Sequence, residues 1–167
     1  EVYLRAASEA LKLGRQVLYL VPEIALATQV IAQLRERFGR RVAILHSNLK
    51  PSERIESWMR IRSGEAPLVL GARSALFSPL TNLGLIVMDE EHEGSYKQES
   101  SPRYHAKGLA RFLATRHNCP VVLGSATPSV ESFFEAEQGG LELLSLPKRV
   151  SNAELPSVHI DDLTEGY

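Results

Sequence analysis

The sequence predicts an open α/β fold built on a mostly parallel sheet. Its strand candidates are continuous apolar runs rather than alternating ones, which is typical of strands buried on both faces. These runs alternate with segments of helical periodicity, and that order favours parallel strands joined by crossover helices. A chain of 167 residues with 44% hydrophobic residues is long enough for one sizeable core of this kind.

The predicted elements follow one another from the start of the chain. Apolar positions at helical spacing predict helices near residues 2–11, at 24–38, from Pro51 past Met59, and from Ala106 past Leu113. Pro51 suits a first helical turn, and Trp58 has core spacing on that helix, so we expect Trp58 to pack inside. Strands are expected at residues 17–21, 42–45, 68–70, 85–88 and 121–123.

The last part of the chain carries weaker signals. Thr127 is expected to cap a helix that has Pro128 at its first position and ends at Gly139. Two weaker strands are expected at 141–146 and 158–160. We expect one domain over residues 1–147 and a linker over 148–167, because that tail is more polar and contains a proline.

Composition excludes several classes of protein. The formal net charge is −1, so the chain is no polycation and any nucleic-acid binding must come from a local patch. The longest apolar runs are too short for a membrane-spanning helix. Cys119 is the single cysteine, which excludes an internal disulfide and a multi-cysteine zinc site.

Polar or glycine residues occur just after each of the first five predicted strands. In open α/β sheets, ligands bind beyond the carboxyl ends of the strands, so these positions predict a working surface. The positions are Pro22-Glu23, His46-Ser47, Gly71 to Ser74, Asp89 to His92, and Gly124 to Thr127.

The run LIVMDEEH contains the most specific candidates for catalytic residues. Asp89 is placed to hold Mg²⁺, directly or through water, and Glu90 to polarise an attacking water, a pairing that phosphoryl transfer needs. The plain alternative is that acidic residues begin a loop because they are solvated there. Ser125 and Thr127 follow the next strand and are candidates to hydrogen-bond this acidic cluster.

LVPE, DEEH and GSATPS, in this order, resemble the motor core of superfamily 2 helicases. The runs HSNLKPSER, GEAPLVLGARSALFSPL, DEEHEGSYKQESSPRYHA and LPKRV are similar to the primosomal protein N′ (PriA) family of bacterial replication-restart helicases. This resemblance implies a RecA-like (P-loop NTPase) three-layer sandwich, incomplete at its N-terminus. Residues 1–147 would be the first ATP-binding lobe, lacking its phosphate loop, and 148–167 the start of a connection toward a second lobe.

The resemblance also implies roles for single residues. Asp89 and Glu90 match the pair that binds Mg²⁺ with ATP and activates water, and His92 is expected to bridge toward Ser125. The nucleotide-binding positions that it implies are Asp89, Glu90, Glu91, His92, Ser125 and Thr127.

DNA contacts are implied at a second set of positions, part of which forms an aromatic-rich loop. Aromatic faces stack on bases without sequence preference, and Lys97 and Arg103 would contact phosphates. The implied DNA-binding residues are Pro22, Ser47, Arg73, Ser74, Tyr96, Lys97 and Tyr104. This chain departs from the family at Lys107-Gly108, where the family has Arg-Asp.

The protein implied by the resemblance is an ATP-dependent 3′→5′ DNA helicase of the bacterial cytoplasm. Its expected partners are single-stranded and forked DNA, other primosome proteins and single-stranded DNA-binding protein, with no membrane contact and with a zinc site outside this chain. The chain opens at Glu1 without a capping residue and contains no GxxxxGK[ST] run. We therefore expect it to begin just after the phosphate loop and to be inactive by itself.

Two alternatives stay open from the residues. One is a non-enzymatic nucleic-acid or protein interaction module derived from a helicase lobe, which would bind DNA regardless of nucleotide. The other is an unrelated Mg²⁺-dependent hydrolase that uses Asp89 and Glu90 and is active as this chain alone.

Overall fold

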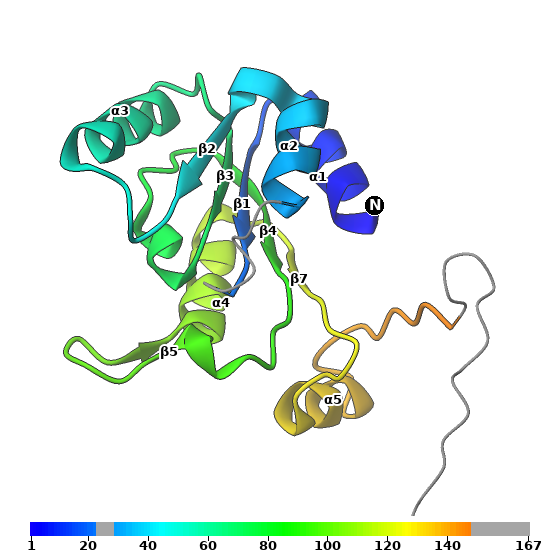
Figure 1. The fold of residues 1–167 in the computed structure, drawn as a ribbon. Coiled ribbons are helices and arrows are strands. Elements are labelled where there is room, and N and C mark those ends of the chain that lie inside the picture. The colour runs from blue at the N-terminus through cyan, green and yellow to red at the C-terminus, as the bar shows by residue number, and fades with distance from the viewer. Residues whose placement is uncertain (23–28, 148–167) are drawn as a thin grey trace, which may run out of the picture. The chain divides into compact units, whose positions relative to one another are not determined.

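The computed structural model describes residues 1–22 and 29–147, which fall into two compact units, residues 1–130 and 131–167. The first unit is built on a five-stranded sheet in the order β2-β3-β1-β4-β7, with every pair parallel (Figure 1). This confirms the predicted open α/β sheet. The strands are β1 Gln16–Leu20, β2 Val42–Leu45, β3 Leu68–Gly71, β4 Leu83–Met88 and β7 Val121–Leu123.

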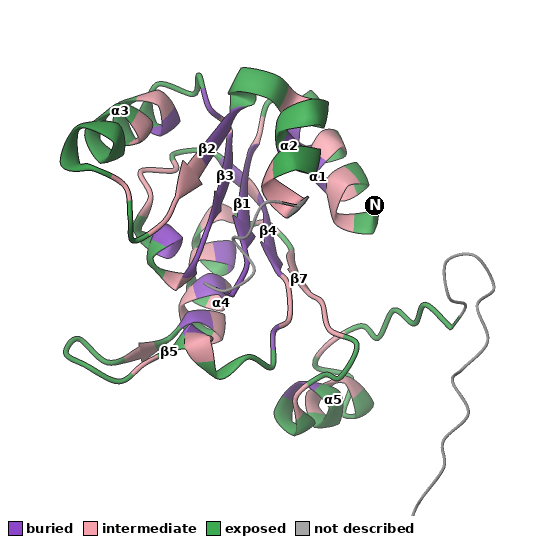
Figure 2. Ribbon diagram, viewed as in Figure 1, coloured by how far each residue is buried: buried purple, intermediate pink, exposed green. Residues whose placement is uncertain are grey.

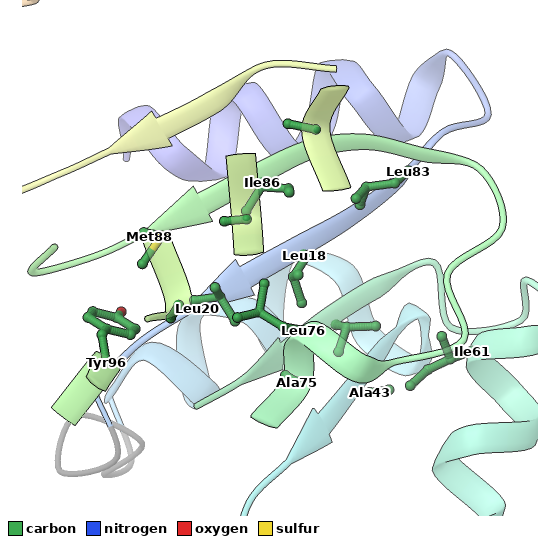
Figure 3. Close-up of a cluster of buried hydrophobic side chains, with 14 of the residues drawn as sticks. Leu18, Leu20, Ala43, Ile61, Ala75, Leu76, Leu83, Ile86, Met88 and Tyr96 are labelled. Carbon is green, nitrogen blue, oxygen red and sulfur yellow. The ribbon is translucent and has the colours of Figure 1, made fainter. Parts of the chain in front are cut away.

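Helices cover both faces of the sheet and give the predicted three layers. Along β1, Leu18 and Leu20 point into one apolar cluster, which includes the alanines of α4 (Ala106–His117). Val17 and Tyr19 point into the opposite cluster, which includes residues of α1 (Val2–Lys12) and α2 (Gln29–Phe38). Figure 2 shows the central strands buried between these layers, and Figure 3 shows the first cluster in detail. Burial on both faces explains why the strands read as continuous apolar runs.

A small antiparallel ribbon lies between β4 and α4. Its strands are β5 (Lys97–Gln98) and β6 (Tyr104–His105), and β6 leads directly into α4. Two short 3-10 helices precede this ribbon along the chain, η3 (Arg73–Phe77) between β3 and β4 and η4 (Gly94–Tyr96) just before β5. We call residues 97–105 the hairpin.

The helix α3 (Pro51–Arg62) buries a different side from the one predicted. Only Ile61 of this helix is buried, whereas Trp58 is 45% exposed and Met59 is 61% exposed. The expectation that Trp58 packs inside is therefore wrong. The helix lies against β2, an edge strand, so the sheet covers only part of its circumference.

Two further expectations differ from the structure. The helix predicted after Thr127 begins only at Val130, as α5 (Val130–Glu137), because the Thr127 N–H donates to Ser125 Oγ at 2.9 Å in a local turn. Residues 141–146 form no strand, and Leu144 is 76% exposed, because an apolar run without a partner edge has no ladder to join. The start of the predicted helix 24–38 and the strand 158–160 lie outside the described residues.

Gly108 provides a prediction about the stability of α4. It lies in the first turns of that helix, and an added Cβ would meet nothing within 4 Å. Gly108→Ala should raise the free energy of unfolding by about 0.5–1 kcal/mol, because glycine loses more backbone freedom than alanine on folding. Urea denaturation of the chain measures this change. Gly14→Ala is the matched control and should destabilise instead, since Gly14 has open space but a φ of +69°. A lower stability for Gly108→Ala would contradict the prediction.

No helix among the described residues is long and apolar enough to cross a membrane.

Candidate nucleotide and DNA site at the carboxyl edge of the sheet

Asp89 stands at the carboxyl end of β4, where the buried strand opens into a loop. Its N–H donates to Leu20 O at 2.9 Å, which extends the pairing with β1 and fixes the backbone. The next residue, Glu90, has a φ of +48°. This left-handed conformation is uncommon outside glycine and occurs where the surrounding structure enforces it, often at functional sites. The turn leaves the Glu90 side chain 45% exposed beside a half-buried Asp89.

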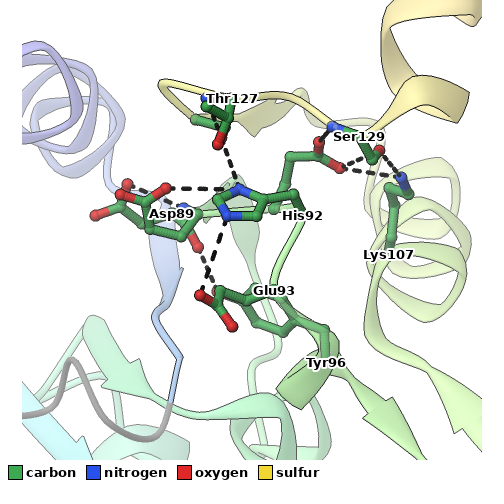
Figure 4. Close-up of polar contacts among 10 residues, drawn as sticks. Asp89, His92, Glu93, Tyr96, Lys107, Thr127 and Ser129 are labelled. Atoms are coloured by element: carbon green, nitrogen blue, oxygen red, sulfur yellow. Dashed lines mark hydrogen bonds and ion pairs between the residues drawn. The ribbon is translucent and has the colours of Figure 1, made fainter. Parts of the chain in front are cut away.

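Three tyrosines surround Asp89. Tyr96 donates its hydroxyl to the Asp89 carbonyl at 2.7 Å (Figure 4), and Tyr3 and Tyr19 lie near enough to Asp89 to feel its charge. Burial, and then the charge of Asp89, raise the pKa of Tyr3 to about 12 and also raise the pKa of Tyr19 and of Tyr96. These hydroxyls therefore stay protonated donors at neutral pH. Sequence reasoning missed Tyr3 and Tyr19, since nothing local marks a residue of α1 or of β1 as a neighbour of Asp89.

The loop after β4 lies beside the loop after β7. The backbone holds them together through Gly124 N–H to Met88 O at 2.8 Å and Glu91 N–H to Gly124 O at 3.0 Å. Beyond the strands, His92 Nδ1 lies 2.8 Å from Ser125 Oγ, which confirms the predicted bridge between these residues. Thr127 lies exposed in the same loop.

Glu91 points away from solvent and is 2% exposed. Its Oε1 accepts from the Ser129 N–H at 2.6 Å, and its Oε2 accepts from Lys107 Nζ at 3.0 Å and from Ser129 Oγ at 3.1 Å. Both carboxylate oxygens are thus engaged inside the protein. The expectation that Glu91 contacts nucleotide is corrected accordingly, because a buried carboxylate held by these donors presents no binding surface.

The acidic pair suits a metal that is shared with a ligand. Among the described residues, no group of three or more His, Cys, Asp or Glu side chains is arranged to hold a metal ion by itself. Mg²⁺ needs no such cage, because it is commonly held by one or two carboxylates together with phosphate oxygens and water. Asp89 is a half-buried oxygen donor of that kind.

Two of the predicted DNA contacts have structural roles instead. Tyr96 is 1% exposed and packs under Asp89, so its ring cannot stack on a base without leaving the core. Arg73 Nη1 donates to Ser95 O at 2.8 Å and to Lys97 O at 2.5 Å. The Arg73 guanidinium therefore fixes the base of the hairpin, and we withdraw both residues as direct DNA contacts.

The other predicted DNA contacts are distributed along the same edge. Lys97 of the hairpin has a side chain that is 65% exposed, and Ser74 of η3 is exposed. Ser47, which follows β2, is exposed. In the sheet, β3 and β1 lie between β2 and β4. Pro22, just after β1, is buried, so its prediction as a DNA contact is corrected, and its neighbour Glu23 lies outside the described residues.

Phe77 is a surface residue that sequence reasoning missed. It is 54% exposed and meets the half-buried Tyr104 ring edge-to-face, with centroids 5.4 Å apart. The sequence signal was weak, since Phe77 lies in a segment without periodicity. The contact places an aromatic residue of η3 beside the hairpin.

A known protein family matches most of this chain. The model of the DEAD/DEAH box helicase family matches residues 1–135. The chain belongs to this helicase family. The matched range includes residues 89–92, which read DEEH in this chain.

Several curated relatives of this helicase chain are replication restart proteins called PriA. The protein of Bacillus subtilis is 49% identical over 99% of this chain and 20% of its own length. That of Treponema pallidum is 47% identical over 99% of this chain and 25% of its own length. That of Haemophilus influenzae is 48% identical over 92% of this chain and 21% of its own length. The chain spans about a fifth to a quarter of the length of these relatives, and the resemblance to the PriA family is confirmed.

Proposed function

We propose that this chain is the nucleotide-hydrolysing lobe of an ATP-dependent DNA helicase that acts in replication restart. The observation that carries the proposal is the placement of Asp89 and Glu90 at the carboxyl edge of β4, tied to the loop after β7 by His92 and Ser125. Relatives named as replication restart proteins, 41% to 49% identical to this chain, support the biological role.

The acidic pair would act on Mg²⁺-bound ATP. Asp89 would hold the Mg²⁺, which supplies positive charge to the phosphates when bound, and the protonated hydroxyls of Tyr3 and Tyr19 lie near this carboxylate. Glu90 would polarise the attacking water. The contact between His92 and Ser125 would report the state of this site to the loop after β7, in which Thr127 is exposed. Residues 1–147 would make up the lobe and 148–167 a connection to the next part of the protein.

The DNA surface would be the hairpin together with η3. Lys97 and Arg103 are exposed cations of the hairpin, and Phe77 with Tyr104 presents aromatic surface beside them. Exposed cations follow the phosphates of a single strand while aromatic rings stack on its bases. Ser47 and Ser74 would add hydroxyl contacts along the same edge.

For the full-length gene product, the proposal extends to 3′→5′ unwinding of forked DNA in the bacterial cytoplasm. Other primosome proteins and single-stranded DNA-binding protein would be its partners, and a zinc site would lie outside this chain.

The proposed DNA surface is tested by replacing one aromatic residue and one cationic residue in separate variants. Phe77→Ala should weaken binding of the full-length protein to an oligo-dT strand about tenfold, because loss of one stacked base costs about 1–3 kcal/mol. Lys97→Ala should reduce the slope of log affinity against log salt by about 0.7, the value for one phosphate contact on a single strand. Fluorescence anisotropy across a salt series measures both changes.

Phe112→Ala is the control for this experiment, because Phe112 is 57% exposed on α4 and outside the proposed surface. Unchanged affinity in both Phe77→Ala and Lys97→Ala would overturn this assignment of the DNA surface. Binding that weakens as expected but ignores a non-hydrolysable ATP analogue would instead favour a non-enzymatic binding module.

A further inference from the structure

The exposed side of α3 carries a tryptophan between two arginines. Arg54, Trp58 and Arg62 are spaced by four residues, so both arginines lie within about 40° of Trp58 around the helix axis. All three residues are exposed, and we call them the α3 stripe. Beside the stripe, Ile55 is 63% exposed and Met59 is 61% exposed (α3 in Figure 2). Neighbouring exposed apolar side chains of this kind mark binding surfaces more often than plain solvated faces.

The carboxylates of α3 point away from the stripe. Glu53 and Glu56 lie about 140° and about 160° around the axis from Trp58, at 3.6 residues per turn. Glu53 accepts from the Lys50 N–H at 2.9 Å. Glu56 lines a hollow beside β2 together with Arg60. In the described part of the chain, neither arginine of the stripe takes part in an ion pair, so the stripe is a cationic surface.

The topology of the sheet determines where the stripe begins and where it leads. The helix α3 joins β2 to β3, which are parallel neighbours. A helix that connects parallel strands starts at their carboxyl ends and runs back to their amino ends. Arg54 is therefore nearer to the carboxyl edge at which Ser47 stands, and Arg62 lies about 12 Å further along the helix. Because β2 is an edge strand, the stripe leads from the carboxyl edge along the outer side of the sheet.

Cations on both sides of an exposed aromatic ring match the chemistry of single-stranded DNA. Such a strand is held by cations that follow its phosphates and by rings that stack on its bases without sequence preference. In the stripe, Trp58 offers the ring, and the two arginines stand on either side of it along the helix. Ile55 and Met59 add apolar surface that suits the faces of bases and sugars.

We propose that the α3 stripe is a second binding surface for single-stranded DNA, separate from the hairpin and η3. A base would stack on Trp58 while Arg54 and Arg62 hold the phosphates before and after it. The bound strand would follow α3 along the outer side of β2. The choice of DNA as the ligand rests on the proposed function, whereas the contacts of the stripe do not depend on those of the hairpin.

The test measures binding of oligo-dT to the full-length protein by fluorescence anisotropy across a salt series. Trp58→Ala should raise the Kd about tenfold, within the range expected for the loss of one stacked base. Trp58→Phe keeps an aromatic ring and should stay within about threefold of the wild-type Kd. Arg54→Ala and Arg62→Ala should each reduce the slope of log affinity against log salt by about 0.7.

Two controls match these substitutions in type and exposure. Arg116→Ala removes an exposed arginine from the last turn of α4, and it should leave the salt slope unchanged. Phe112→Ala removes a 57% exposed ring from the same helix, and it should leave the Kd unchanged. Because every replaced side chain is exposed, all of these variants should keep the wild-type melting temperature.

The fluorescence of Trp58 gives a readout that a purely structural role would not move. The difference in emission between the wild-type protein and Trp58→Phe isolates the signal of this ring. Oligo-dT should quench that signal, with a midpoint at the Kd measured by anisotropy. Acrylamide should quench it readily before DNA is added, because the ring is exposed.

Three outcomes would overturn the inference. A Kd within twofold of wild type for Trp58→Ala, with unchanged salt slopes for both arginine variants, would remove the stripe from the DNA path and leave the proposed function standing. A Trp58 signal that is shielded from acrylamide without DNA would assign the stripe to a protein contact. A wild-type protein that does not bind oligo-dT would defeat the proposed function and, with it, the choice of ligand.

Discussion

Replacing Glu90 with glutamine is expected to lower DNA-stimulated ATP turnover by the full-length protein at least a hundredfold. Glutamine keeps the size of the side chain but cannot accept a proton or polarise water as a carboxylate does, and general-base catalysis contributes about 10²–10⁴-fold. Glu90 has a left-handed backbone with a φ of +48°, and its Oε2 lies 3.7 Å from His92 Nδ1. Phosphate release at saturating oligo-dT, ATP and Mg²⁺ measures the effect.

Glu93→Gln is the matched control for this substitution. Glu93 belongs to the same loop, and its side chain is 46% exposed, close to the 45% of Glu90. The Glu93→Gln variant should retain ATP turnover within about twofold of the wild-type rate. A Glu90→Gln protein that hydrolyses ATP within tenfold of the wild-type rate would remove Glu90 from the reaction.

Gly124→Ala is expected to disturb the site and the fold together. An added Cβ would lie 1.6 Å from Tyr3 Oη and 2.6 Å from Tyr3 Cζ, so the ring has to move. That ring packs edge-on against Tyr19, with centroids 5.7 Å apart, and it lies near the charge of Asp89. Forcing extra volume into such a contact typically costs about 1–3 kcal/mol. Urea denaturation of the chain should show a loss of this size.

Gly94→Ala is the control for Gly124→Ala, because an added Cβ there meets nothing within 4 Å. Its free energy of unfolding should change by less than about 0.5 kcal/mol, as expected for a surface position. In a Tyr3→Ala background, Gly124→Ala should cost much less than in the wild-type chain. Equal stabilities for the two single alanine variants would contradict the close packing at Gly124.

The sheet was predictable because burial on both faces leaves a direct mark on the sequence. Runs such as residues 85–88 are apolar at every position, and β4 is indeed enclosed by helices on both sides. The buried face of α3, which packs against an edge strand, was harder to predict. Helical spacing alone does not indicate how much of a helix the sheet covers. Trp58 has the spacing of a core residue and is nevertheless 45% exposed.

The candidate site was predictable only where neighbouring residues share a strand end. Asp89 and Glu90 were candidates because of the strand end at which they stand, whereas the bridge from His92 to Ser125 was implied by the family resemblance. The resemblance implied Tyr96 and Arg73 as DNA contacts, but Tyr96 folds back under Asp89 and Arg73 donates to backbone carbonyls at the base of the hairpin. Such contacts join distant parts of the chain, and local patterns carry no information about them.

Strand separation on forked DNA tests the central claim most directly, with the full-length protein and its Glu90→Gln variant compared side by side. The wild-type protein should separate the strands only when both ATP and Mg²⁺ are present. The variant should bind the fork and leave it intact. Separation by Glu90→Gln at the wild-type rate would contradict the account. So would a wild-type protein that binds the fork but neither hydrolyses ATP nor separates its strands.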